Sequence, residues 1–181
     1  MKLLFTGASG FLGSNVRPLL EGMYGVKTVG LSPKDDYTID IAKEIPVLRE
    51  RYDIVLHVAG KAHSVPKTEA ERQVFFDVNL QGTKNLCTAL ERRRVPRAFI
   101  FISTVAVYGC AYGENITEDH PLDGDTPYAM SKRLAEEYLQ KWCYEHNVIL
   151  GIIRPSLIAG PNPPGNLGAM IYGIRSGKYL S

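Results

Sequence analysis

The chain has 181 residues, of which 45% are hydrophobic and 22% are charged, as in an ordinary folded protein. These proportions exclude a disordered, collagen-like or coiled-coil chain, and folding removes about 70% of the surface of a chain this long, enough for one core. Lysine and arginine exceed aspartate and glutamate by only 2, so charge gives no reason to expect a nucleic-acid or membrane partner. The run Arg92-Arg93-Arg94 is interpreted as the solvated end of a helix.

Targeting segments, disulfides and metal motifs are not evident in the sequence. No apolar run approaches the length of a membrane span, and the stretch after Met1 is too short for a signal peptide, so we expect a cytoplasmic protein. The wide spacing of Cys87, Cys110 and Cys143 favours reduced thiols. The four histidines lack metal-motif spacing, so no metal site is expected.

Short apolar runs alternate with longer segments of helical periodicity, and no internal repeat interrupts them. This alternation predicts a parallel α/β sheet whose strands are apolar on both faces because helices cover both sides. The expected strands lie at residues 2–6, 26–31, 37–41, 54–59, 98–103 and 148–153. The expected helices lie at residues 11–22, 42–51, 69–94 and 128–146, with a helix-like segment at 166–177.

A glycine-rich turn follows the first expected strand and opens the first expected helix. Gly7 and Gly10 permit a tight turn that lets a pyrophosphate approach backbone amides at the helix N-terminus, where the helix dipole favours anions. Gly13 allows the helix to pack closely against the strand. The spacing is G-x-x-G-x-x-G rather than G-x-G-x-x-G, and a turn without a ligand is the alternative interpretation.

A tyrosine and a lysine four residues apart open the last long expected helix. Tyr128 and Lys132 share one helix face, and a nearby cation lowers the pKa of a phenol toward the range where it exchanges protons with an alcohol. Thr104, at the end of the fifth expected strand, offers a hydroxyl to the same substrate oxygen. Farther along this helix, the apolar stripe predicts that Glu136 faces solvent.

In their order along the chain, these motifs resemble the extended short-chain dehydrogenase/reductase family, NAD-dependent epimerase/dehydratase type, which includes nucleotide-sugar 4-epimerases. The resemblance covers nearly the whole chain. It rests on residues 6–13, 40–41, 53–60, 78–83, 103–109, 128–132, 154–155 and 160–161. It implies a Rossmann-like doubly wound parallel sheet, with an NAD(P)-binding domain at 1–160 and the start of a truncated substrate-binding lobe at 161–181.

The resemblance also implies roles for individual residues. Tyr128 would be the catalytic acid/base, Lys132 would bind the nicotinamide ribose and tune the tyrosine, and Thr104 would assist it. The expected cofactor is NAD or NADP. The residues expected to bind it are Gly7, Gly10, Phe11, Leu12, Gly13, Ser32, Asp40, Ile41, Val58, Ala59, Gly60, Asn79, Tyr128, Lys132 and Pro155.

Simpler structural roles stay open for several of these positions. Asp40 could instead cap the helix expected at 42–51, and Asn79 with Gly82 could face solvent on a helix. His57, on an apolar strand, suits a core histidine whose hydrogen bonds are satisfied, which gives it no catalytic role.

Departures from the family pattern bear on the cofactor and the reaction. Family enzymes continue beyond the position of Ser181, so we expect that most of the substrate lobe is missing. Ser32 stands where NAD-using relatives carry a carboxylate, with Lys34 close by, which leaves NAD against NADP open. The short connection between residues 31 and 40 resembles the dTDP-4-dehydrorhamnose reductases and favours a 4-ketoreductase.

The expected function is an NAD(P)-dependent oxidoreductase or epimerase that acts on a nucleotide sugar through a 4-keto intermediate. The alternatives are an NADPH-dependent reductase of nucleotide 4-keto sugars and, from another class, a dinucleotide-binding regulator without catalysis. Dehydration is disfavoured because Val105 and Ala106 stand where sugar 4,6-dehydratases carry acidic residues. The resemblance further implies a homodimer formed through the helices at 69–94 and 128–146.

Overall fold

The computed structural model describes residues 1–62, 64–110, 112–163 and 165–178. Its strands form one parallel sheet in the order β3-β2-β1-β4-β5-β6. They are β1 (Lys2–Thr6), β2 (Gly25–Gly30), β3 (Tyr37–Thr38), β4 (Ile54–His57), β5 (Ala98–Ile102) and β6 (Ile149–Ile153). The chain builds outward from β1 to β3 and then returns to build the other half from β4, which is the doubly wound order. The predicted Rossmann-like sheet is confirmed.

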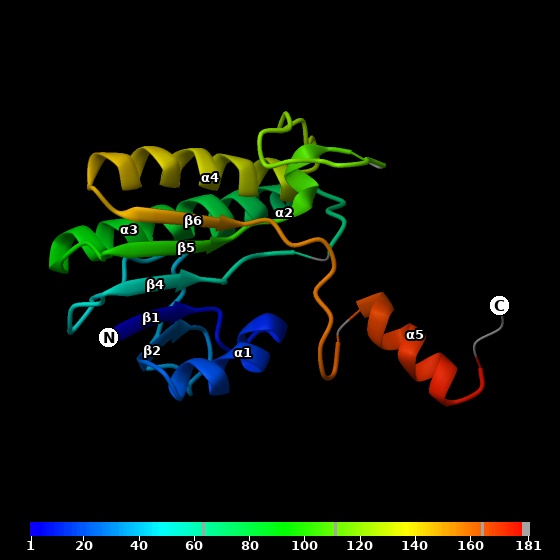
Figure 1. Cartoon of the computed structure of the whole chain (residues 1–181), viewed down its shortest axis with the longest axis horizontal. Coiled ribbons are helices and arrows are strands. Elements are labelled where there is room, and N and C mark those ends of the chain that lie inside the picture. The colour runs from blue at the N-terminus through cyan, green and yellow to red at the C-terminus, as the bar shows by residue number, and fades with distance from the viewer. Residues whose placement is uncertain (63, 111, 164, 179–181) are drawn as a thin grey trace.

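Helices connect the strands (Figure 1). They are α1 (Phe11–Glu21), α2 (Glu69–Phe76), α3 (Gly82–Arg93), α4 (Pro127–Glu145) and α5 (Gly165–Arg175), with a π-helical turn at Asp77–Gln81 and a 3-10 turn at Val105–Tyr108. Figure 1 shows α3 and α4 running side by side, and the Trp142 indole of α4 donates to Glu91 of α3 at 2.6 Å. The last helix, α5, lies apart from the sheet (Figure 1).

The core lies between the sheet and helices α3 and α4. Leu4, Val55 and Phe99 from three neighbouring strands are fully buried, and they belong to one cluster with Leu86 of α3 and Leu139 of α4. Alternate residues of each strand reach this layer because strand side chains alternate between faces. This packing stabilises the sheet. Because the strands are parallel, their carboxyl ends lie at the same edge, which is where ligands bind in folds of this kind.

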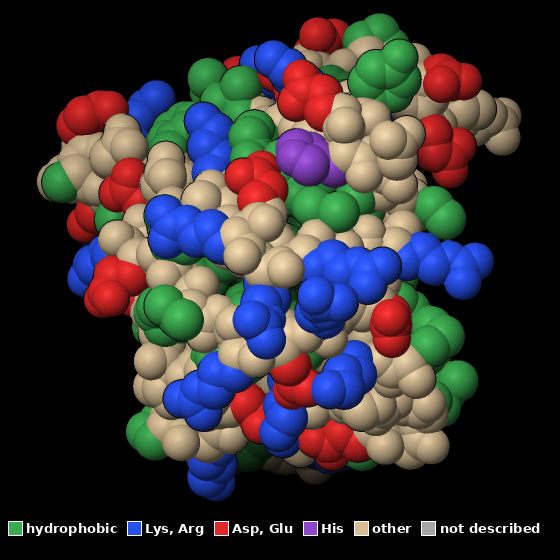
Figure 2. All heavy atoms as spheres, turned by 90° about the vertical axis from the view of Figure 1, so that its left-hand side faces the viewer, with side chains coloured by type: hydrophobic (Ala, Val, Ile, Leu, Met, Phe, Trp, Pro, Cys, Tyr) green, Lys and Arg blue, Asp and Glu red, His purple; other side chains and the backbone are tan. Residues whose placement is uncertain are grey.

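The opposite edge, at the amino ends of the strands, is rich in lysine and arginine side chains, with acidic side chains among them (Figure 2). Helix α3 ends at this edge, and Arg92 and Arg93 in its last turn are exposed. The interpretation of this run as a solvated helix end is confirmed.

Most predicted elements are present with slightly different bounds. The helix predicted at 69–94 runs from Glu69 to Arg93, but the π-helical turn divides it into α2 and α3. The segment predicted at 166–177 is helix α5. The predicted boundary between residues 160 and 161 stays a prediction, and Pro164 and residues 179–181 of the expected lobe lie outside the described residues.

The helix predicted at 42–51 is wrong. Asp40 does begin a turn, since its Oδ1 accepts the amide of Ala42 at 3.1 Å. The turn ends before Pro46, which has no amide hydrogen and disfavours helical geometry in the residue before it. Leu48 and Tyr52 nevertheless reach the core, with 7% and 3% exposure. An irregular backbone therefore buries Leu48 and Tyr52, while Val47 between Pro46 and Leu48 is 80% exposed.

The expectation that strands are covered on both faces fails at β6. This strand is last in the sheet order, and its Ile149 and Ile153 are 62% and 50% exposed. Its apolar side chains thus form a partly open edge in the described part of the chain.

Three further expectations concern absent features. Within the described residues, no helix is both long enough and apolar enough to cross a membrane. The same residues contain no group of three or more His, Cys, Asp or Glu arranged to hold a metal, and His63 lies outside them. The three cysteines are free, with Cys87 and Cys143 buried and Cys110 exposed.

Candidate active site

The predicted site residues lie in the segments that follow the strands, at the carboxyl edge of the sheet. Gly7, Gly10, Phe11, Leu12 and Gly13 follow β1, Ser32 follows β2, Asp40 and Ile41 follow β3, Val58, Ala59 and Gly60 follow β4, Thr104 follows β5, and Pro155 follows β6. Asn79 belongs to the π-helical turn, and Tyr128 and Lys132 belong to the first turns of α4.

The turn after β1 is closed so tightly that side chains are excluded from it. Gly7 has a φ of 74°, and a Cβ there would lie 2.5 Å from the amide nitrogen of Ala59. A Cβ on Gly13 would lie 2.1 Å from the carbonyl oxygen of Gly7. Gly10 caps α1 without a side-chain hydrogen bond, so the free amides of the first helical turn suit an anion. This cradle fits the pyrophosphate of a dinucleotide.

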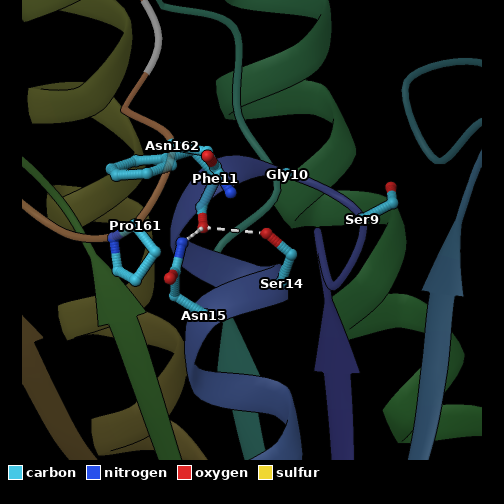
Figure 3. Close-up of a pocket in the computed structure, with 7 residues that line it drawn as sticks. All are labelled: Ser9, Gly10, Phe11, Ser14, Asn15, Pro161 and Asn162. Carbon is cyan, nitrogen blue, oxygen red and sulfur yellow. Dashed lines mark hydrogen bonds between the residues drawn. The ribbon is translucent and has the colours of Figure 1, made fainter. Parts of the chain in front are cut away.

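A cavity of about 400 Å³ opens at this helix N-terminus (Figure 3). Figure 3 shows the side chains of Ser14 and Asn15 both bonding to the carbonyl of Phe11, at 3.1 and 2.8 Å. Pro161 and Asn162, from the segment after β6, line the same cavity. No sequence pattern indicated these last two residues as neighbours of the turn, because they lie far from it along the chain.

Thr104 and Tyr128 lie near each other in the part of the candidate site beside α4. Thr104 is 8% exposed and caps the 3-10 turn, where its Oγ1 accepts the amide of Ala106 at 3.2 Å. Burial raises the pKa of Tyr128, and the nearby Thr104 side chain opposes that rise. The predicted lowering of the phenol pKa is therefore wrong for this structure, because the loss of hydration outweighs the favourable partner. Phe75 of α2 packs near the ring, with centroids 6.3 Å apart.

Lys132 is buried beside them, with 3% exposure. Its Nζ donates to the carbonyl of Ile102 at 2.6 Å and lies 4.0 Å from the centre of the Phe101 ring. Burial lowers the pKa of Lys132 to about 7, and the negative charge of Glu136 opposes this shift. The lysine therefore changes charge near neutral pH while it is bonded to a strand carbonyl.

Asn79 ties the segment after β4 to helix α4. Its side chain bonds to both the amide and the carbonyl of Lys61, at 2.8 and 3.1 Å, and donates to Ser131 Oγ at 2.9 Å. A Cβ on Gly60 would lie 3.0 Å from Asn79 Oδ1 and 3.7 Å from Lys132 Nζ. The alternative of a solvent-facing pair is wrong, since Asn79 is 1% exposed and Gly82 is buried too.

The remaining predicted residues lie around this centre. The carbonyl of Pro155 accepts the amide of Val105 at 3.2 Å, which places it beside Thr104. A Cβ on Gly82 would lie 3.2 Å from Ile41, which therefore packs against α3. Ser32 and Asp40 form their hydrogen bonds within their own loops, so the structure does not join them to the other site residues by a bond.

A buried ion pair that the sequence did not predict joins α4 to the segment after β6. Glu136 is fully buried, contrary to the predicted exposure, because Arg154 from the end of β6 covers it with a contact of 2.7 Å. Arg154 also donates to the phenol of Tyr108 at 2.9 Å and to the carbonyl of Glu118 at 3.0 Å. The hydrogen bonds with Glu136 and Tyr108 raise the pKa of Arg154. The pair thus fastens α4 to the loop after β5.

Comparison with known proteins shows which proteins this chain is similar to in sequence and in structure. The chain is 31% identical over 186 residues to the N-acetyl-alpha-D-glucosaminyl-diphospho-ditrans,octacis-undecaprenol 4-epimerase of Escherichia coli O157:H7, covering 98% of this chain and 55% of that protein. It is similar to the crystal structure of the UDP-glucose 4-epimerase of Thermus thermophilus in complex with NAD, with a TM-score of 0.79 and 28% identity, covering 95% of this chain and 61% of that one.

The chain is also similar to the structure of RMD from Pseudomonas aeruginosa complexed with NADPH, with a TM-score of 0.81 and 26% identity, covering 99% of this chain and 62% of that one. It therefore spans little more than half the length of the relatives it matches. A profile of the NAD dependent epimerase/dehydratase family matches residues 3–180. The chain belongs to the NAD dependent epimerase/dehydratase family.

Proposed function

We propose that this chain is the cofactor-binding and catalytic part of an epimerase that acts on a sugar carrying a diphosphate group, through a 4-keto intermediate. The observation that supports it most is the pairing of Tyr128 with Thr104 at the same sheet edge as the glycine turn. Gly60 lies between the glycine turn and the Tyr128 region. It is close to Lys132, and it follows strand β4, which pairs with the strand that precedes the glycine turn. Two of the relatives named above act, by their names, on UDP-glucose and on a diphospho-undecaprenol sugar.

In this mechanism Tyr128 removes the proton of the sugar 4-hydroxyl and later returns it. The Thr104 side chain favours the ionised phenol. A protonated Lys132, one helical turn along α4 from Tyr128, would add to that preference. Lys132 would also hold the nicotinamide ribose, and the glycine turn would hold the pyrophosphate. A bound nicotinamide would supply hydride chemistry at the sugar carbon. An epimerase returns the hydride to the other face of the ring and so regenerates its cofactor.

The test is Tyr128→Phe in the whole protein. Loss of the phenol hydroxyl should reduce turnover by about 10²- to 10⁴-fold, the usual contribution of an acid/base group, while NAD affinity stays nearly unchanged. Tyr144→Phe is the matched control, because Tyr144 lies on the same helix and is 87% exposed. Turnover that survives in Tyr128→Phe at the level of the control would refute the assignment.

A 4-ketoreductase is the second candidate, favoured by the short connection from β2 to Asp40. Such an enzyme consumes NADPH, and Tyr128 donates a proton to the reduced oxygen. A regulator without catalysis is the third candidate, although it has no need of Tyr128 and Lys132.

Mass spectrometry of the nucleotide retained by the whole protein, together with activity assays, separates the three candidate functions. Bound NAD favours the epimerase, and empty protein with NADPH affinity favours the reductase. Cofactor binding without turnover on any nucleotide sugar or lipid-diphosphate sugar favours the regulator.

For the cofactor of the epimerase we propose NAD rather than NADP, on the basis of Asp35. This residue is 8% exposed, and its Oδ2 accepts the amide of Ser32 at 3.1 Å. A Cβ on Gly30, at the end of β2, would lie 2.4 Å from the same carboxylate oxygen. A fixed negative charge at this position repels the additional phosphate of NADP. Equal affinity for the two nucleotides in the whole protein would contradict this choice.

The setting of the protein is also a proposal. We propose a cytoplasmic homodimer that pairs through the helices at 69–94 (α2 and α3) and 128–146 (α4), with residues 161–181 beginning the substrate-binding lobe. Analytical ultracentrifugation of the whole protein tests the dimer.

A further inference from the structure

His57 lies at the centre of a buried line of hydrogen bonds that begins under the glycine turn. The amide of Ala59 donates to Thr6 Oγ1 at 3.1 Å, and Thr6 Oγ1 lies 2.6 Å from His57 Nδ1. On the other side of the ring, His57 Nε2 lies 2.9 Å from Thr83 Oγ1. Thr6, His57 and Thr83 are each fully buried. Ala59 is the residue whose backbone excludes a side chain at Gly7.

The line continues from Thr83 to the catalytic helix. The Thr83 hydroxyl donates to the carbonyl of Asn79 at 2.7 Å, and the Asn79 amide donates to Ser131 Oγ at 2.9 Å. The Ser131 hydroxyl donates to the carbonyl of Tyr128 at 2.8 Å. Ser131 precedes Lys132, so the line ends at the backbone that carries both the phenol and the amine.

Counting protons fixes the direction of every bond. A carbonyl oxygen only accepts, so the Thr83 hydroxyl spends its one proton on Asn79 and must accept from His57. Nε2 therefore carries the proton of the ring. A neutral imidazole then accepts at Nδ1, which obliges Thr6 to donate there and to accept the amide of Ala59.

The surroundings of the ring keep it neutral. Phe99 and Phe101 flank it, with ring centroids at 5.9 and 5.6 Å. Burial lowers the pKa of His57 to about 3, and the positive charge of Lys132 acts in the same direction. A neutral ring has one proton to place, so its position is a defined property of this protein.

We propose that His57 is a positioning residue, protonated on Nε2, that holds the glycine turn at one end and helix α4 at the other through this line of hydrogen bonds. The inference rests on the proposed function in one respect, because the two ends matter together only if both serve a dinucleotide enzyme. Any buried histidine needs partners for its ring nitrogens, so the satisfied bonds alone decide nothing. What distinguishes His57 is that its two partners, Thr6 and Thr83, lead to opposite ends of the site.

The first test is nitrogen-15 NMR of the histidines in the whole protein at neutral pH, assigned with His57→Gln. We expect the His57 ring to show a protonated Nε2 and a bare Nδ1 as one stable tautomer. A proton on Nδ1, or averaging between the two nitrogens, would overturn the proposal. This measurement needs no cofactor, so it stands even if the proposed function fails.

The second test separates the two ends of the line by NAD affinity and turnover. In His57→Gln the amide nitrogen reaches the Nε2 position and keeps Thr83 bonded, whereas Thr6 loses its partner, so NAD affinity should fall about tenfold. In His57→Asn the side-chain oxygen reaches the Nδ1 position and keeps Thr6 bonded, so NAD affinity should stay within about threefold while turnover falls about tenfold.

Val55→Ala is the matched control, because Val55 is a fully buried neighbour on the same strand outside the line. It should lower stability yet leave NAD affinity within about twofold. Equal losses of NAD affinity in His57→Gln, His57→Asn and Val55→Ala would show that only core stability matters and would overturn the proposal. If the wild-type protein binds neither NAD nor NADP, the proposed function fails and the tautomer alone decides the inference.

Discussion

The glycine turn after β1 and the first turns of α4 meet at the same edge of the sheet, but different parts of the chain form them. At the turn, the backbone of Gly7 and Gly13 packs so closely on its neighbours that a single additional carbon collides. At α4, buried polar side chains form the contacts instead. Lys132 bonds to the carbonyl of Ile102 in β5, and Glu136 pairs with Arg154. We therefore expect the turn to be destabilised by substitutions that add atoms, and the helix to be destabilised by substitutions that remove them.

This difference has a chemical basis. A diphosphate is recognised through backbone amides, which must come close to it, so the recognising segment carries small residues. Proton exchange needs side chains whose pKa values the protein adjusts, so the segment that we propose as catalytic carries titratable groups in buried surroundings. Each half of the site should therefore fail in its own way when it is altered.

The largest expected effect comes from removing an atom group at the helix. Glu136→Ala leaves the Arg154 guanidinium, whose side chain is 12% exposed, without its charged partner. Breaking a buried ion pair in this way costs about 3–5 kcal/mol of unfolding free energy. Urea unfolding followed by circular dichroism measures it, and a loss below about 1 kcal/mol would contradict the buried pair.

The next effect comes from adding one carbon at the turn. Gly13→Ala places a Cβ 2.1 Å from the carbonyl oxygen of Gly7, which forces the turn to shift and should cost about 1–3 kcal/mol with loss of NAD binding. Gly22→Ala is the control, since a Cβ there lies 3.5 Å from its nearest neighbour. Calorimetry of NAD binding and urea unfolding should separate the two variants, and similar behaviour would argue against a sterically closed turn.

The same two regions differ in how far the sequence alone predicts them. The glycine turn was predictable because strand, glycines and helix are consecutive, so a local pattern carries the whole geometry. The exposure of Glu136 was mispredicted because helical periodicity shows one buried stripe, while Arg154 covers a second face from 18 residues farther along. Thr6 and Thr83 were missed as partners of His57 for the same reason, since only the sheet register and the π-helical turn bring them together.

Burial of Lys132 predicts a pH dependence of stability. The pKa of this lysine falls from an ordinary 10.5 to about 7 in the folded protein, so between these values the unfolded chain binds more protons. Stability should therefore rise with pH from about 7 to 8.5, by at most about 1.4 kcal/mol per pH unit. Lys132→Met removes the titrating group, and urea unfolding at several pH values should show a flatter profile.

The upper limit of that pH range matters. Burial raises the pKa of the Cys87 thiol, so at higher pH the unfolded chain loses a proton that the folded protein keeps. Stability then falls with pH, opposite to the effect of Lys132. A wild-type slope equal to that of Lys132→Met below about pH 8.5 would show that the amine is not in the low-dielectric position described.

The smallest expected effect tests whether burial, rather than charge, makes Glu136 important. Lys141 and Glu145 form an ion pair on the same helix with a separation of 3.9 Å, but their side chains are 77% and 52% exposed. Water already solvates both groups, so Glu145→Gln should change the unfolding free energy by less than about 0.5 kcal/mol, and less still in high salt. Urea unfolding of this variant beside Glu136→Ala compares two glutamates of one helix. If Glu145→Gln and Glu136→Ala lost the same unfolding free energy, the presence of an ion pair would explain both losses. Burial of the Glu136 pair would then add nothing to the stability of α4.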